Sequence, residues 1–138
     1  MAAPFLDSNV VLYALAEADV RRPAARAILA QEFVVSAQTL NECASVASRK
    51  FHLPWDDIAE FLGGLADNAQ RFVLLDAALN ASAIGLAERY KLAFYDALII
   101  AAALHADCDT LYSEDMQDGL VIERRLTIRN PFADLRLA

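Results

Sequence analysis

The stretch PFLDSNVVLYALAEA, residues 4–18, contains both kinds of regular structure that we expect in this chain. Its first part, PFLDS, is a short apolar run that ends at an acid, as a buried strand does. The second part, residues 9–18, has apolar residues at helical spacing, with Val11, Ala14 and Leu15 on one face. A strand that leads directly into a helix indicates an α/β fold.

The same alternation continues to the end of the chain. Further strands are expected at FVVS (33–36), RFVLLD (71–76) and DTLYS (109–113), with another in the tail RRLTIRNPF (124–132). Helical patterns cover residues 21–31, 37–50, 54–68, 77–91 and 96–106, the third of them weakened by Gly63 and Gly64. The sequence therefore predicts a single α/β domain over residues 1–138, with a central, mainly parallel sheet of four or five strands flanked by helices.

Composition limits the classes of function. The chain has 138 residues, 57% of them hydrophobic, which is typical of a compact globule. Its net charge of −7 excludes nucleic-acid binding by bulk electrostatics. Local basic clusters are interpreted as solvated helix faces: Arg21–Arg22, Arg49–Lys50, Arg89 with Lys91, and Arg124–Arg125.

No targeting or membrane segment is evident in the sequence. The longest apolar run, 97–104, is far shorter than the roughly 18 residues of a membrane span. The start MAAPFLD lacks the regions of a signal peptide, so we expect a cytoplasmic protein without membrane contact. Cys43 and Cys108 have no metal-binding spacing and are expected to be packed, reduced thiols.

Four acids stand where the predicted elements meet. Asp7 ends the first strand, Glu42 lies in the early turns of the helix after FVVS, Asp96 begins the apolar helix and Asp115 follows the fourth strand. The carboxyl ends of parallel strands line one crevice, where ligands bind in open α/β sheets. These carboxylates can therefore converge.

Each acid also has an ordinary explanation. Asp7, Asp96 and Asp115 could cap a helix or a turn, since Asp is a favoured N-cap residue. Glu42 is too deep in its helix to cap it, although a solvated face would explain it. Clustered carboxylates repel one another unless a cation neutralises them, and oxygen-only ligands favour Mg²⁺ or Mn²⁺.

The acids lie in segments that occur together in a known family. FLDSNVVLYAL, TLNECASVASRKF, FYDALIIAAAL and LYSEDMQDG, with NPF near the end, resemble the PIN-domain family, and within it the VapC-like toxins of bacterial toxin–antitoxin pairs. The resemblance implies an Mg²⁺- or Mn²⁺-dependent endoribonuclease that hydrolyses RNA phosphodiester bonds. It also implies a cognate antitoxin as partner, and a homodimer.

Carried over by position, the resemblance makes Asp7, Glu42, Asp96 and Asp115 the catalytic and metal-binding set. The three aspartates are expected to ligate the ion directly or through water, while Glu42 ligates it or orients the attacking water. Ser8, Ser113 and Asp118 are auxiliary. Glu114 is expected to point elsewhere.

A second interpretation comes from another class of protein. A phosphoacceptor receiver domain also has an acidic Mg²⁺ pocket at its strand ends, and Asp76 after FVLLD resembles its acceptor. That interpretation lacks a second acid beside Asp7 and leaves Glu42 and Asp96 unexplained. The histidines, His52 and His105, are expected to be packing or surface residues, and Trp55 and Tyr95 core or interface residues before base-stacking ones.

Overall fold

A computed structural model describes residues 2–135 of the chain. One six-stranded sheet crosses the molecule in the order β3-β2-β1-β4-β6-β5. The strands are β1 (Phe5–Leu6), β2 (Val34–Ser36), β3 (Arg71–Val73), β4 (Thr110–Tyr112), β5 (Val121–Ile122) and β6 (Leu126–Arg129). All neighbours are parallel except β5 and β6, which are antiparallel. The predicted α/β fold with a mainly parallel sheet is confirmed.

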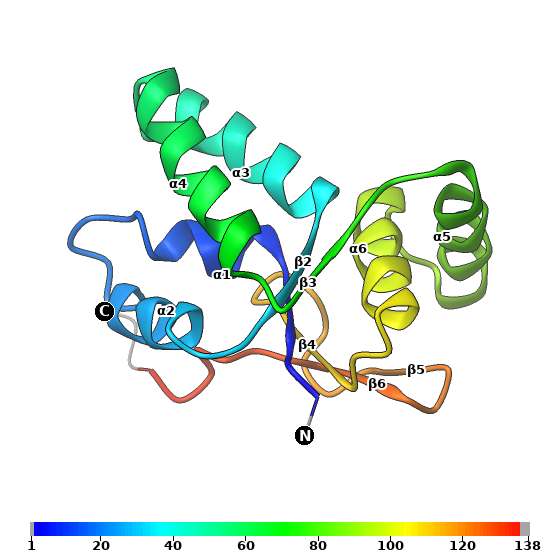
Figure 1. The fold of residues 1–138 in the computed structure, drawn as a ribbon. Coiled ribbons are helices and arrows are strands. Elements are labelled where there is room, and N and C mark those ends of the chain that lie inside the picture. The colour runs from blue at the N-terminus through cyan, green and yellow to red at the C-terminus, as the bar shows by residue number, and fades with distance from the viewer. Residues whose placement is uncertain (1, 136–138) are drawn as a thin grey trace.

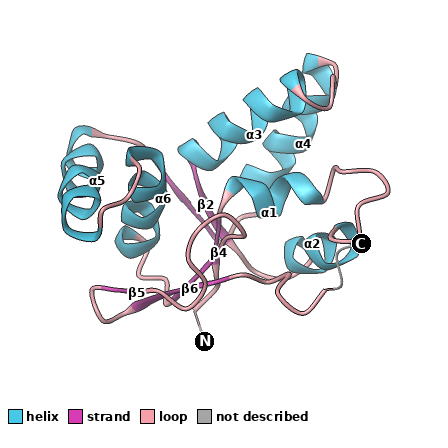
Figure 2. Cartoon of the chain, turned by 180° about the vertical axis from the view of Figure 1, so that it is seen from behind, coloured by secondary structure: helices cyan, strands magenta, loops and turns pink. Residues whose placement is uncertain are grey.

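Helices cover both faces of this sheet. They are α1 (Ser8–Tyr13), α2 (Arg22–Leu29), α3 (Ala37–Arg49), α4 (Trp55–Asn68), α5 (Ala77–Tyr90) and α6 (Phe94–His105). Figure 1 shows α5 and α6 on one side of the strands and α1 to α4 on the other. The same separation is visible from behind in Figure 2. The fold therefore has three layers, with the sheet in the middle.

Alternation along β1 divides the core in two. Phe5 and Leu6 are both fully buried, but Phe5 packs with residues of α5 and α6, whereas Leu6 packs with those of α1, α3 and α4. Successive strand residues point to opposite faces, so a strand apolar in both positions must be covered on both sides. This makes β1 a central strand whose carboxyl end is enclosed by both helical layers.

The helix α6 is the most deeply buried element. Every residue from Ala97 to Leu104 is buried, as the apolar pattern all round this segment predicted. It packs against the sheet on one side and against α5 on the other. Asp96, in its first turn, stands directly before the first of these buried residues.

The sheet has six strands, where four or five were predicted. The strand that was not predicted is the two-residue β5. It forms by pairing with β6 through a tight turn, in which Glu123 and Arg124 have φ angles of 52° and 59°. Hairpin turns with two such angles usually carry Asn or Gly, so the sequence here gave no turn signal. The helix α1 is also shorter than predicted and ends at Tyr13. By contrast, α4 runs uninterrupted through Gly63 and Gly64.

Several minor expectations can be compared with this fold. His52 and His105 are exposed, and Cys43 and Cys108 are buried free thiols, as expected. Trp55 and Tyr95 are 67% and 59% exposed, so the core role expected for them was wrong, while the interface role stays a prediction. Within residues 2–135, no helix is both long and apolar enough to span a membrane.

A capping interaction at the start of α5 provides a test of the fold. The Asp76 side chain accepts a 2.8 Å hydrogen bond from the backbone N–H of Leu79. Replacing an N-cap Asp with Ala typically costs about 1 kcal/mol. We therefore expect Asp76→Ala to lower the melting temperature by about 3 °C, measured by circular dichroism. An unchanged melting temperature would contradict this cap.

Candidate metal centre

Asp7 is the innermost acid of the chain, with 5% of its surface exposed. It lies between β1 and α1, where its Oδ1 accepts a 2.8 Å hydrogen bond from the Ser8 N–H and so caps α1. Its Oδ2 accepts a 2.8 Å hydrogen bond from the Ser113 hydroxyl. The capping role that the sequence suggested is real, but only one of the two carboxylate oxygens is used for it.

Ser113 reaches Asp7 because β1 and β4 are parallel neighbours. Leu6 is in register with Tyr112, and the Asp7 N–H donates to the Tyr112 carbonyl oxygen at 3.0 Å. The residue after each strand therefore lies at the same edge of the sheet. Ser113 is fully buried, and its hydroxyl also accepts from the Met116 N–H at 3.3 Å.

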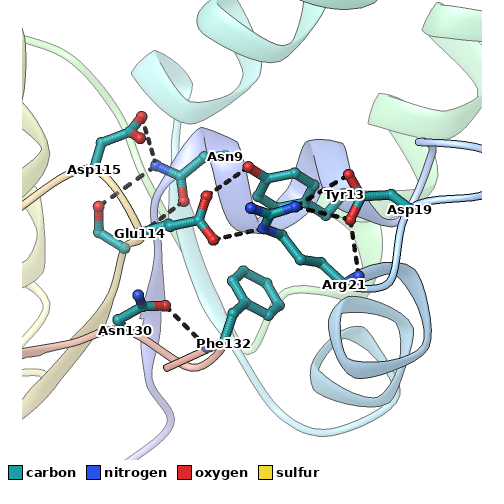
Figure 3. Close-up of polar contacts among 9 residues, drawn as sticks. Asn9, Tyr13, Asp19, Arg21, Glu114, Asp115, Asn130 and Phe132 are labelled. Atoms are coloured by element: carbon teal, nitrogen blue, oxygen red, sulfur yellow. Dashed lines mark hydrogen bonds and ion pairs between the residues drawn. The ribbon is translucent and has the colours of Figure 1, made fainter. Parts of the chain in front are cut away.

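Asn9 joins Asp7 to Asp115. Its side-chain Nδ2 donates to Asp7 Oδ2 and to Asp115 Oδ2, each at 3.2 Å. Its Oδ1 accepts from the Glu114 N–H at 3.1 Å, and Figure 3 shows the Asn9 side chain between Glu114 and Asp115. Sequence reasoning missed Asn9. Its only signal there was a polar residue in the first turn of an otherwise apolar helix.

Asp96 and Glu42 come from the two helical layers. Asp96 is a first-turn residue of α6, but the N-cap of that helix is Ala93, so the capping explanation for Asp96 was wrong. Glu42 lies inside α3, too far from its Ser36 cap to take part in it. Both side chains belong to half-buried residues.

The raised pKa values of Asp7, Asp96 and Glu42 each have the charge of at least one other of the four acids among their causes. Burial raises the pKa of Asp7, as do the charges of Asp96 and Asp115, while hydrogen bonds from Ser113 and Ser8 lower it. Burial and then the charge of Asp115 raise the pKa of Asp96. Burial raises the pKa of Glu42, followed by the charge of Asp7; Ser8 and Gln38 lower it, and Asp96 adds a smaller increase. The four predicted acids therefore share one electrostatic environment.

The acids are linked through their charges, but their side chains do not lie close enough together to enclose an ion. Within residues 2–135, no three His, Cys, Asp or Glu side chains lie close enough together to hold a metal ion as they stand. The two observations agree, because charges act over longer distances than a metal–oxygen bond of about 2.1 Å. Mg²⁺ usually keeps several waters, through which more widely spaced carboxylates can bind it. The oxygen-only donor set fits such a hard ion.

The remaining acids of the loop after β4 have other partners. Asp118 Oδ1 accepts from the Asn130 N–H at 3.0 Å, which ties the loop to the end of β6. Glu114 points away from Asp115, as expected, but it is not solvated: it binds Tyr13 and Arg21. The interpretation of Arg21 as part of a solvated helix face was therefore wrong, since its side chain is 19% exposed.

The sequence from residue 5 to residue 117 matches the family model of the PIN domain, a span that contains all four acids. The chain belongs to the PIN-domain family. A search of curated protein sequences found no significant match.

Three solved structures illustrate the likeness of the fold. VapC20 of Mycobacterium tuberculosis, a sarcin–ricin loop cleaving toxin, superposes with a TM-score of 0.67 at 17% identity, covering 82% of this chain and 92% of its own. A toxin–antitoxin complex from Klebsiella pneumoniae gives 0.67 at 21%, covering 94% and 98%. VapBC2 of Rickettsia felis, bound to a promoter DNA fragment, gives 0.65 at 16%, covering 94% and 98%. At these identities the likeness shows a shared PIN fold.

The receiver interpretation is excluded by the family and by the sheet. In a receiver-type sheet of order 2-1-3-4-5 the third strand adjoins the first. Here β3 is an edge strand, separated from β1 by β2. Asp76, the residue proposed as acceptor, is exposed and caps α5 instead.

Burial of Asp96, and then repulsion by Asp115, predict a pH-dependent gain in stability from Asp96→Asn. Because the folded chain raises the pKa of Asp96, the folded state favours the protonated carboxyl. The associated stability is present below the unfolded pKa of about 3.9 and is lost as the pH rises. In EDTA, we expect Asp96→Asn to melt at a higher temperature than the wild type at pH 7, with the difference vanishing toward pH 4.

Thermal unfolding followed by circular dichroism from pH 4 to pH 7 measures this difference. Asp56→Asn, at an exposed acid in the first turn of α4, is the control and is not expected to gain stability. An Asp96→Asn variant that is less stable than the wild type at pH 7 would contradict the repulsion.

Proposed function

We propose that this chain is a divalent-metal-dependent endoribonuclease, acting as the toxin of a toxin–antitoxin pair, with residues 1–138 as one PIN-like nuclease domain. The observation that carries the proposal is that carboxylates from separate elements of a PIN fold come together: Asn9 bridges Asp7 and Asp115, and the charge of Asp7 acts on Glu42 and that of Asp115 on Asp96. A carboxylate set of this kind suits metal-assisted hydrolysis.

In this proposal Asp7, Asp96 and Asp115 hold Mg²⁺ or Mn²⁺, directly or through water. When bound, the ion would neutralise the charge that develops on the phosphodiester oxygens during hydrolysis. The donors of Ser113 and Asn9 keep the Asp7 oxygens oriented. A side-chain hydrogen bond with Ser8 lowers the pKa of Glu42. Asp118 supports the loop that carries Asp115.

Glu42 is assigned to the attacking water. Its raised pKa, caused first by burial and then by the charge of Asp7, suits it to orient that water and accept its proton. The water oxygen attacks phosphorus, the bond to the leaving oxygen breaks, and the leaving oxygen takes up a proton. His52 and His105 are exposed residues at helix ends and have no part in this chemistry.

The substrate is RNA, which a chain of net charge −7 does not attract at long range. Binding therefore depends on the cation and on local contacts at the crevice. The RNA-cleaving activity named for VapC20 supports this substrate. Such an enzyme acts where cellular RNA is, so the proposal places it in the cytoplasm.

The proposed protein partners are a cognate antitoxin and a second copy of the chain. The Klebsiella and Rickettsia structures, both toxin–antitoxin assemblies with this fold, support the antitoxin. Support for the homodimer comes from exposed apolar side chains that follow β3: Leu74 is 72% exposed, Leu75 is 38% exposed and Ile84 on α5 is 54% exposed. Exposed apolar patches mark interaction surfaces.

Metal dependence tests the enzymatic proposal. The purified chain, free of antitoxin, should cleave RNA in Mg²⁺ or Mn²⁺ and lose this activity in EDTA. Asp115→Asn should lower the cleavage rate by about 100-fold, because it removes a proposed ligand. Asp118→Asn should lose less, because Asn can still accept from the Asn130 N–H.

Asp109→Asn is the matched control, since Asp109 precedes β4 and so lies at the amino end of the strand, away from the predicted acids. It should cleave like the wild type. Equal cleavage with and without EDTA, or no cleavage in any divalent ion, would count against the proposal.

The homodimer is tested by light scattering coupled to size-exclusion chromatography. Leu74→Asp, which places a charge in the proposed interface, should convert a dimer of the wild type into a monomer. Val121→Asp is the control. Val121 is 50% exposed but lies on β5, the outermost strand on the side of the sheet opposite to β3. A wild type that elutes as a monomer, or a dimer that both variants retain, would refute this interface.

A further inference from the structure

The loop that carries Asp115 has no regular structure of its own. Between the end of β4 at Tyr112 and the start of β5 at Val121, the chain forms neither helix nor strand. Its backbone is tied to β6 near its two ends, by Ser113 N–H to the Arg129 carbonyl and Gly119 N–H to the Ile128 carbonyl. The direction of the exposed Asp115 side chain therefore depends on side-chain contacts between this loop and other parts of the chain.

Glu114 makes the shortest of these contacts. One carboxylate oxygen accepts from the Tyr13 hydroxyl and the other from Arg21 Nε, both at 2.6 Å. These residues come from α1 and from the segment before α2. Figure 3 shows the Glu114 carboxylate directed toward Tyr13 and Arg21 and the Asp115 carboxylate directed toward Asn9. We call Glu114, Tyr13 and Arg21 the Glu114 clamp.

The two donors are themselves fixed in place. The Arg21 guanidinium carbon lies 4.6 Å from the centroid of the Tyr13 ring, and Arg21 Nη1 donates to Asp19 Oδ1 at 3.1 Å. The Tyr13 ring packs edge-on against Phe132, at 5.3 Å between centroids. Both members of the Arg21–Glu114 pair are mostly shielded, with side chains 19% and 17% exposed. The clamp is thus preorganised and holds Glu114 in one position.

An ordinary ion pair that merely stabilises the loop would explain these contacts, but it would not explain their arrangement. Glu114 is fixed on both its backbone and its side chain, since Asn9 Oδ1 accepts from its N–H. The same Asn9 donates to Asp7 and to Asp115. A displacement of Glu114 would therefore disturb Asn9 and its hydrogen bonds to both acids.

We propose that Glu114 is a positioning residue for the metal centre: the Glu114 clamp directs Asp115 toward Asn9 and Asp7, and Arg21 keeps the Glu114 carboxylate away from the cation. This inference rests on the proposed nuclease function. A free carboxylate one residue from Asp115 would add repulsion to the four acids or compete for the ion. The ion pair removes it from that competition.

The proposal predicts a particular order among variants. Glu114→Ala releases the loop and should weaken Mn²⁺ binding by about 10-fold, the lower end for loss of a supporting contact. Glu114→Gln should remain within about twofold of the wild type, because Gln can accept from Arg21 and donate to the Tyr13 oxygen. Arg21→Ala should bind Mn²⁺ no more tightly than Glu114→Ala does. The double variant, Arg21→Ala with Glu114→Ala, should bind Mn²⁺ no more weakly than Glu114→Ala alone, since both substitutions act through one contact.

The experiment combines Mn²⁺ titration by calorimetry, RNA cleavage at increasing Mn²⁺, and thermal unfolding for these variants. Saturating Mn²⁺ should restore most of the cleavage rate of Glu114→Ala. Asp76→Ala is the control, because it removes a cap from α5 without touching the loop. It should melt earlier and bind Mn²⁺ like the wild type. Tyr13→Phe keeps the ring beneath Arg21 and removes one hydrogen bond, so it should show a smaller loss of affinity even if Arg21→Ala fails to fold.

Two results would overturn the inference while leaving the nuclease proposal intact. The first is a wild type that binds Mn²⁺ and cleaves RNA with an unchanged Mn²⁺ affinity in Glu114→Ala. The second is a loss of Mn²⁺ affinity that Asp76→Ala shares in proportion to its lower melting temperature. A wild type that neither binds Mn²⁺ nor cleaves RNA would remove both proposals.

Discussion

Parallel pairing between β1 and β4 determines where the chemistry of this protein lies. The register places Leu6 beside Tyr112, so the next residue of each strand, Asp7 and Ser113, meet at the carboxyl edge of the sheet. From there α1 leaves toward one helical layer, while the first turn of α6 reaches the same edge from the other. A shift of one residue in this register would turn Asp7 to the other face of the sheet and separate it from Ser113.

The acids at the carboxyl ends of these strands destabilise the folded state. Asp7 is almost completely buried, and its charge is stabilised by donors from Ser8, Asn9 and Ser113 rather than by an Arg or Lys. Burial opposes its ionisation most, followed by the charges of Asp96 and Asp115, and together they raise its pKa. A protein selected only for stability would not keep four such carboxylates together, because each raises the energy of the others. Functional sites are where proteins accept this kind of conflict.

Local signals explain which elements the sequence could predict. The helices at 37–49 and 55–68 were predicted to within a residue or two, because their apolar spacing is regular and Pro54 marks the start of the second. The acids could be placed because each follows a predicted strand or lies in an adjoining helix. β5 could not be predicted, since its two residues become a strand only by pairing with β6. The early end of α1 also contradicts good helical propensity in residues 14–18, so tertiary context decides it.

Contacts between distant residues escaped the sequence altogether. Glu114 and Arg21 are 93 residues apart, and either one alone is typical of a solvated surface. Nothing local marks them as partners. Asn9 has the same difficulty, since its link to Asp115 spans 106 residues. The positions of the four predicted acids could thus be inferred from strand ends, whereas the contacts of their neighbours exist only in the folded chain.

The two glycines of α4 have a consequence for how the protein moves. A Cβ atom at Gly63 or Gly64 would meet no heavy atom within 4 Å, so packing does not require their small size. In a helix interior each costs roughly 1 kcal/mol relative to alanine. The outer helix of the α3–α4 pair therefore opens at a lower free energy than α6, whose residues from Ala97 to Leu104 are all buried. The deeply buried helix α6 thus carries Asp96 in its first turn, whereas the opposite layer contains a helix that unfolds locally more readily.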